Sequence, residues 1–415
     1  MPLGFYLIMA AQFFSALADN ALLVVAIHAL NGLNAPLWQI PLLKFFFTVS
    51  YVLLAPFVGA FADSMPKGRV MFLSNGIKVI GAVLMLVHLH PLLAYAVVGL
   101  GAAAYSPAKY GILTESLPHN RLVVANGWIE GLTVGAIILG VLLGGFLVDA
   151  RVLDPILRLA IPGLDSELTV ALLVVALLYV AAAVFNCFIA DTGVDHKPLK
   201  GNPIYLVHDF AHCLKLLWRD RLGQISLGLT TLFWGAGATL QFVVIDWAAT
   251  NLGLNLSESS KLQGVVAIGI AIGAVAAARL VSLKGAVRVI PLGVIMGLLV
   301  PLLVAVRDVG LALPLLVMVG ACAGFFVVPM NALLQHRGHI LMGAGHSIAI
   351  QNFNENLAIL IMTGLYAALL GFGLSVSLVI VLFGLFVALS TYLIGRKHVS
   401  NQKKCDVLAL LDHVS

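Results

Sequence analysis

The sequence predicts an all-α integral membrane protein with twelve transmembrane helices. Of its 415 residues, 61% are hydrophobic and only 10% are charged, and the mean hydropathy is +1.07. Soluble proteins are about 45–50% apolar and about 25% charged. A soluble protein of this length needs a charged surface, so most of the surface of this chain must face lipid.

Twelve apolar segments are each long enough to cross a bilayer, which takes about 20 residues. They are 5–33, 37–62, 70–88, 91–115, 122–149, 168–190, 223–249, 261–282, 287–306, 310–334, 341–371 and 374–395. Several exceed the minimum length, so we expect tilt or overhang.

The longest polar break between these segments is 191–222, which contains Pro198, Gly201 and Pro203. It divides the chain into two sets of six helices. The predicted organisation is a six-helix half at 1–190, a linker at 191–222, a second six-helix half at 223–395 and a tail at 396–415.

The basic residues predict the orientation, because cytoplasmic loops of membrane proteins are rich in Lys and Arg. With both termini in the cytoplasm, the inside holds Lys67, Arg69, Arg121, Lys197, Lys200, Lys215, Arg219, Arg221, Lys284, Arg288, Arg337, Arg396, Lys397, Lys403 and Lys404. The outside then holds only Arg151, Arg158 and Arg307. We therefore expect cytoplasmic termini and a bacterial inner membrane.

The sequence offers little support for an enzyme. It lacks a phosphate-binding loop, a complete GxGxxG and a GxSxG. His88 and His90 lie two residues apart in a predicted outer loop, and no third metal ligand is near them. A lipid-modifying membrane enzyme would need a cluster of His, Asp or Ser at one membrane face. We therefore expect no metal, no cofactor and, because the net charge of +5 is spread over loops, no nucleic-acid partner.

Polar groups at membrane depth are the candidate functional residues. Asp19 and Asn20 lie in the middle of the first predicted helix, Lys109 in the fourth, Glu130 in the fifth and Glu355 in the eleventh. A charge at the bilayer centre costs roughly 2.5–3.5 kcal/mol, so such groups face the interior of the helix bundle. They serve either as structural ion pairs or in substrate binding and gating.

Prolines at matching places of the two halves are candidate flexible points. Pro107 lies in the fourth helix and Pro329 in the tenth. Each removes a helical hydrogen bond, which suits a transporter whose halves rock against each other. The alternative is that proline is simply tolerated in membrane helices.

The segment after the second helix resembles a motif of the major facilitator superfamily. It has Gly59, Asp63 and then the basic residues Lys67 and Arg69. In that superfamily the motif latches the inner gate. Ser64 departs from the pattern, where arginine is usual. The alternative is an ordinary basic cytoplasmic loop.

Five segments across both halves closely resemble the LplT family of lysophospholipid transporters. They are SALADNALL (15–23), GAAAYSPAKYGIL (101–113), LFWGAG (232–237), FFVVPMNALLQ (325–335) and QNFNEN (351–356). The resemblance implies a major facilitator fold that flips lysophospholipids, chiefly lysophosphatidylethanolamine, to the cytoplasmic leaflet by alternating access. It also implies a cytoplasmic acyltransferase/acyl-ACP synthetase that restores the missing acyl chain.

The resemblance also suggests how such a substrate is held. Lys109 suits the phosphate, and Asp19 or Glu355 suits the ammonium. Asn20 and Asn352 belong to the matching segments and are expected in the same site. Gln241 is a departure, because arginine is common there in the family, and glutamine cannot neutralise a phosphate. We expect a monomer. The alternative function is a proton-coupled multidrug or small-solute antiporter, in which Asp19 and Glu355 carry protons.

Overall fold

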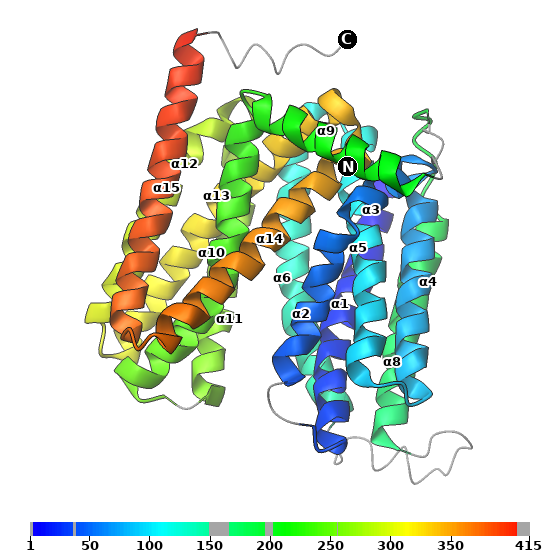
Figure 1. Ribbon diagram of the computed structural model, residues 1–415, viewed down its shortest axis with the longest axis horizontal. Coiled ribbons are helices and arrows are strands. Elements are labelled where there is room, and N and C mark those ends of the chain that lie inside the picture. The colour runs from blue at the N-terminus through cyan, green and yellow to red at the C-terminus, as the bar shows by residue number, and fades with distance from the viewer. Residues whose placement is uncertain (1–2, 36–38, 149–165, 196–201, 255, 405–415) are drawn as a thin grey trace. The chain divides into compact units, whose positions relative to one another are not determined.

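The computed structural model describes residues 3–35, 39–148, 166–195, 202–254 and 256–404, and it has helices but no strand among them (Figure 1). The α-helices are α1 (Leu3–Gly32), α2 (Gln39–Leu53), α3 (Ala55–Asp63), α4 (Lys67–Leu86), α5 (Pro91–Ser116), α6 (Leu122–Leu147), α8 (Glu167–Cys187), α9 (Pro203–Arg219), α10 (Gly223–Leu252), α11 (Leu256–Leu280), α12 (Ile290–Leu299), α13 (Val309–Met342), α14 (Ala344–Gly371) and α15 (Val376–Lys404). Three 3₁₀ helices are η1 (His119–Arg121), η2 (Leu283–Val289) and η3 (Val300–Ala305). Four basic residues used to predict the orientation, Arg151, Arg158, Lys197 and Lys200, lie outside the described residues.

The predicted all-helical membrane fold is confirmed. Within the described residues, eleven helices are long and apolar enough to cross a membrane, and the bent pair α2–α3 makes a twelfth. These two helices meet at an angle of 63°. Pro56 explains the break, because its ring nitrogen cannot donate to the carbonyl of Val52 and its ring crowds the preceding turn.

The predicted linker 191–222 contains a helix, α9, that its Pro and Gly residues did not suggest. The side chain of Asn202 accepts a hydrogen bond from the backbone of Ile204 at 3.0 Å, and Pro203 suits the first position of a helix. The buried side of α9 carries Phe210, Cys213 and Leu217, and the exposed side carries His208, Lys215 and Arg219. The helix is therefore amphipathic.

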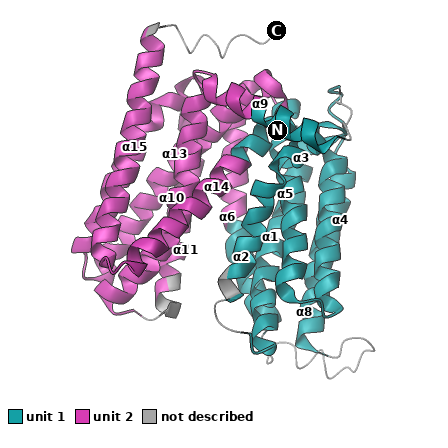
Figure 2. Cartoon of the chain, viewed as in Figure 1, with its two compact units in different colours: residues 1–116, 135–211, 344–352 teal, residues 117–134, 212–343, 353–415 magenta. Residues whose placement is uncertain are grey.

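The chain forms two compact units (Figure 2). Unit 1 comprises residues 1–116, 135–211 and 344–352, and unit 2 comprises residues 117–134, 212–343 and 353–415. Helices α6 and α14 each begin in one unit and continue in the other. The predicted division into sequential halves stays a prediction, because compactness alone does not identify a repeat.

Within unit 2, α11 and α13 pack through two matching pairs of glycines. Gly269 and Gly273 on α11 face the backbone of α13, and Gly320 and Gly324 on α13 face the backbone of α11. A side chain at Gly273 would overlap the carbonyl oxygen of Ala321. Small residues four apart allow close backbone approach, which is how helices associate in lipid.

We predict that Gly273→Ala destabilises the protein, because the added methyl group forces α11 and α13 apart. The expected loss is about 1–3 kcal/mol. Thermal unfolding of the purified protein in detergent measures it. Gly264→Ala is the matched control on the same helix, since nothing lies within 4 Å of a Cβ there. Equal melting temperatures for the two variants would contradict the packing account.

Candidate functional site

Asp19 on α1 is held by two partners within unit 1. Its carboxylate lies 2.8 Å from Nζ of Lys78 on α4, and it accepts a hydrogen bond from the Tyr179 hydroxyl on α8, also at 2.8 Å. The Lys78 side chain is 2% exposed and that of Asp19 is 19% exposed. The pair satisfies the requirement that charges at membrane depth be paired, and the carboxylate is its accessible member.

Lys78 also contacts a cluster of polar side chains around the ion pair. Its ammonium donates to Oγ of Ser15 at 3.0 Å, and Ser15 donates to Oδ1 of Asn75 at 2.8 Å. The ring of Tyr105 lies 5.1 Å from Nζ, within range of a cation–π contact. Glycine at 101 permits this arrangement, because a Cβ there would lie 2.7 Å from Cγ of Lys78.

Lys78 is the residue that sequence reasoning missed. Sequence analysis placed Asp19 and Lys109 in the substrate site, whereas the ion pair of Asp19 is made with Lys78. The available signal was position: Lys78 lies in the middle of the predicted helix 70–88, where a cation must find an anion.

Four of the other predicted binding residues lie on α1, α5 and α14. Lys109 is buried on α5, with its ammonium 4.1 Å from the ring of Tyr110. Asn352, near the start of α14, donates to Oγ of Ser106 at 2.9 Å, beside Pro107. Glu355 is buried further along α14. The amide of Asn20 donates to the Ala16 carbonyl of its own helix at 2.8 Å.

Asp63 binds the first turn of α14 within unit 1. Its carboxylate accepts hydrogen bonds from the backbone N–H groups of Gly345 at 2.8 Å and His346 at 3.1 Å, and it lies 2.7 Å from Nδ1 of His346. Free N–H groups and the helix dipole make a helix N-terminus a natural site for a carboxylate. Gly59 lets the helices meet, because a Cβ there would lie 2.9 Å from Cβ of Ala349.

Lys67 completes this network. Its ammonium lies 2.7 Å from Asp63 and 3.2 Å from Glu115 on α5. The second ring nitrogen of His346 lies 3.2 Å from Asp209 on α9. Sequence reasoning identified Gly59, Asp63 and Lys67 but missed Glu115, His346 and Asp209, which come from distant segments. Arg69 is exposed and forms no ion pair among the described residues.

A second polar contact lies within unit 2, at the start of α6. Asn331 on α13 donates to Glu130 at 3.2 Å, and Asn126 and Gln335 exchange two hydrogen bonds at 2.8 and 2.9 Å. Pro329 lies two residues before Asn331 on α13. The contact is close, because a Cβ at Gly127 would lie 2.5 Å from Cβ of Ala278 on α11.

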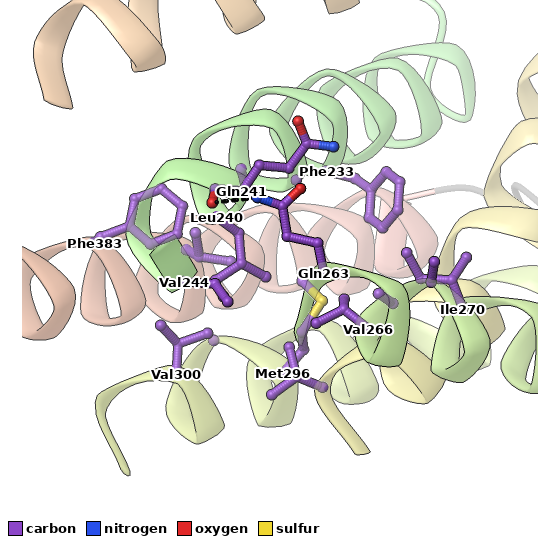
Figure 3. A pocket seen from close by; sticks show the side chains of 17 residues that line it. Phe233, Leu240, Gln241, Val244, Gln263, Val266, Ile270, Met296, Val300 and Phe383 are labelled. Carbon is purple, nitrogen blue, oxygen red and sulfur yellow. Dashed lines mark hydrogen bonds between the residues drawn. The ribbon is translucent and has the colours of Figure 1, made fainter. Parts of the chain in front are cut away.

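Unit 2 also contains an apolar cavity between α10, α11, α12, α13 and α15 (Figure 3). It holds about 770 Å³ of space, part of which is open to the surroundings. The described lining has no charged residue; it comprises Phe233, Ala236, Gly237, Leu240, Gln241, Val244, Gln263, Val266, Ala267, Ile270, Met296, Gly297, Val300, Val319, Ala323, Phe383 and Val387.

Two glutamines are the polar members of this lining. Figure 3 shows the Gln263 amide reaching the backbone oxygen of Gln241, at 3.1 Å. Gln241 is exposed on α10, so its amide remains available at the edge of the cavity. Among the described residues, no group of three His, Cys, Asp or Glu side chains is placed to hold a metal ion.

This fold and these sites place the chain in a known class of membrane protein. Residues 8–349 match the Major Facilitator Superfamily, so the chain belongs to that superfamily and is a transporter rather than an enzyme. It is 43% identical over 374 residues to the lysophospholipid transporter LplT of Yersinia enterocolitica, covering 90% of this chain and 89% of the relative. LplT of Yersinia pestis is 42% identical over 88% of this chain and 86% of the relative. The chain is therefore a member of the LplT family.

Solved structures agree on the fold. The human organic anion transporter MFSD10 superposes with a TM-score of 0.74 at 15% identity, covering 95% of this chain and 100% of that one. A bacterial homologue of the iron transporter ferroportin, in an outward-facing state, gives 0.70 at 13% identity, covering 97% of this chain and 100% of that one. At these identities the likeness concerns the fold alone.

We predict that Lys78→Met destabilises the protein, because it leaves the Asp19 carboxylate without its cation. Breaking a buried pair costs about 3–5 kcal/mol, whereas removing both charges is often nearly neutral. The double variant Asp19→Asn/Lys78→Met should therefore recover most of the loss in thermal unfolding experiments. A double variant as unstable as the two single variants combined would show that the charges are not coupled.

Proposed function

We propose that this protein transports lysophospholipids across the inner membrane to its cytoplasmic leaflet by alternating access. The observation that carries the proposal is the 42–43% identity to LplT proteins over about nine-tenths of the chain. The distribution of side chains supports it. Unit 1 carries a partly exposed charge in a polar cluster, and unit 2 carries an apolar cavity, while a lysophospholipid has a charged head group and one acyl tail.

The Asp19 carboxylate is the proposed partner of an ethanolamine ammonium group. It is the exposed member of its ion pair, so a ligand can reach it without displacing the buried Lys78. Lys109 is the proposed partner of the phosphate, since an ammonium forms charge-assisted hydrogen bonds with phosphate oxygens. Asn20 and Asn352 are proposed to complete the head-group site, and Glu355 is proposed as a further substrate-binding residue.

The apolar cavity of unit 2 is the proposed site of the acyl tail. Its lining is aliphatic and aromatic except for Gln241 and Gln263. Gln241 can donate a hydrogen bond to a phosphate oxygen, but it adds no charge. Head-group selection in this protein should therefore depend on its charged residues, Asp19 and Lys109 above all.

The network around Asp63 is the proposed gate. Asp63 holds the first turn of α14 through two backbone N–H groups and His346, and α14 continues from unit 1 into unit 2. Releasing these bonds would free the start of α14. We propose corresponding roles for Gly59, Lys67 and Arg69, and for Glu130, Pro107 and Pro329 in the helices that move.

The cellular setting follows from the orientation and the product. The excess of basic residues on one side supports cytoplasmic termini. Lysophospholipid delivered to the cytoplasmic leaflet lacks one acyl chain, so we propose that a cytoplasmic acyltransferase/acyl-ACP synthetase consumes it. We propose that the transporter works as a monomer.

We predict that Asp19→Asn impairs lysophosphatidylethanolamine more than lysophosphatidylglycerol, because only the former carries an ammonium. Losing a charge-assisted hydrogen bond should lower uptake on the order of tenfold or more. Lys109→Ala should abolish uptake of both lipids, and Lys109→Arg should retain part of it. The measurement is uptake of each radiolabelled lipid from outside into the cytoplasmic leaflet of spheroplasts, normalised to transporter content.

The variant Asp19→Asn/Lys78→Met controls for the uncompensated lysine in this experiment. The same assay, run with lipids of different chain length, tests the tail site. The added side chain of Gly237→Leu projects into the cavity and should reduce uptake of long-tailed lipids first. Gly364 has equally free space around it but lies outside the cavity, so Gly364→Leu is the control and should leave uptake of long-tailed lipids unchanged. Equal loss of both head groups in Asp19→Asn would reject ammonium recognition, and full activity in Lys109→Ala would reject the phosphate assignment.

We predict that Asp63→Asn changes the maximal transport rate rather than substrate affinity. The amide keeps the size of the carboxylate but loses the charge that pairs with Lys67 and faces the first turn of α14. Charged hydrogen bonds contribute about 1.5–3 kcal/mol each, so a rate change of at least about tenfold is expected. Asp195→Asn, in an exposed loop, is the matched control. An unchanged rate in stably expressed Asp63→Asn would remove the gating role.

A further inference from the structure

A second groove in unit 2 lies apart from the cavity of Figure 3 and shares no lining residue with it. It is formed by η2, α12 and the last turns of α15, and it holds about 1780 Å³ of space open to the surroundings. Its described lining comprises Val287, Arg288, Ile290, Pro291, Val294, Ile295, Tyr392, Gly395, Arg396, His398, Val399, Ser400 and Lys403.

Three cations meet in this groove without a compensating acid. Arg288, Arg396 and Lys403 line it, and the described lining contains no Asp or Glu. None of the three forms an ion pair with any residue that the structure describes. In addition, Nδ1 of His398 is buried there without a hydrogen-bond partner among those residues. The groove therefore presents positive charge to an incoming anion.

The cations lie at the level of the membrane interface. Helix α15 has 29 residues, which corresponds to about 43 Å, whereas the hydrocarbon core is about 30 Å thick. Its last turns, with Arg396 and Lys403, must therefore reach the polar head groups. Arg288 directly precedes the apolar helix α12, and Tyr392 is one turn before Arg396, as expected for an interfacial aromatic residue.

The groove continues from the cations along an apolar wall. Ile290, Val294 and Ile295 of α12 line it, and the Ile295 side chain is exposed. A soluble anion would need only the cations, whereas a phospholipid has both a phosphate and acyl chains that match this wall. Basic pockets between transmembrane helices are where anionic lipids bind.

We propose that this groove binds one intact anionic phospholipid of the surrounding leaflet, with its phosphate among Arg288, Arg396 and Lys403 and an acyl chain along α12. A lipid with an ammonium head group fits less well, because that ammonium would lie among three cations. The bound lipid is a resident of the protein surface rather than the transported substrate.

The test is native mass spectrometry of the purified, delipidated full chain titrated with phosphatidylglycerol or phosphatidylethanolamine. The wild type should bind one phosphatidylglycerol in preference. Each interfacial cation is worth about fivefold in affinity, so Arg288→Gln/Arg396→Gln/Lys403→Gln should weaken that binding on the order of 100-fold. The matched control Lys215→Gln/Arg219→Gln/Arg307→Gln removes three exposed cations elsewhere and should bind as the wild type does.

If the triple variant does not fold, Arg396→Gln alone should weaken binding about fivefold, and Arg288→Lys/Arg396→Lys should retain it. Equal binding of the two lipids, or an unchanged affinity in the triple variant, would overturn the proposal. Displacement of the lipid by inorganic phosphate at constant ionic strength would also overturn it, because the site would then recognise a free anion. The readout does not involve transport, so it stands independently of the proposed function.

Discussion

The cost of a charge in hydrocarbon governs the design of this protein. Asp19 and Lys78 occur on two helices that would each be expensive to insert alone, and the 2.8 Å pair between them removes most of that cost. The surroundings of the pair then follow. Tyr179 donates a further hydrogen bond to Asp19, and Ser15 accepts one from Lys78. Glycine is required at position 101 because the aliphatic part of the Lys78 side chain occupies the space of a Cβ there.

The same constraint distinguishes the two ends of the ion pair. A fully enclosed pair would contribute only to folding. Here the anion is partly accessible and the cation is not, so a neutral pair presents a negatively charged carboxylate to a ligand. A ligand cation therefore meets a site that attracts it while the protein stays electrically balanced when the site is empty. That balance suits a carrier, which must release what it binds.

Composition and periodicity were enough to predict the membrane fold, because twelve long apolar runs have no other stable arrangement in lipid. They were not enough to predict α9, whose Pro and Gly flanks resemble those of a loop and whose apolar residues are spaced for one helix face only. Within the site, Asp63 and Lys67 are four residues apart and could be recognised as a motif. Their partners Glu115, Asp209 and His346 depend on tertiary structure, so spacing along the chain holds no sign of them.

Lys78 was within reach of sequence reasoning, because it lies in the middle of the predicted helix 70–88, but it was not among the predicted site residues. The error shows that the depth of a charge in its helix is as informative as its presence. Pro56 is a comparable case for the backbone. The apolar run 37–62 looks continuous in the sequence, but the missing backbone N–H of Pro56 accompanies a bend of 63° between α2 and α3.

The glycine pairs of α11 and α13 have a mechanical consequence. Backbones that touch without intervening side chains cannot slide past each other, because every displacement along the axis brings a Cα against a carbonyl oxygen. Shear between packed helices normally depends on side chains that change rotamer, and this interface has none at its closest points. These two helices should therefore move together as one rigid body. Any flexibility within unit 2 must come from elsewhere, such as the 3₁₀ helices η2 and η3 that flank α12.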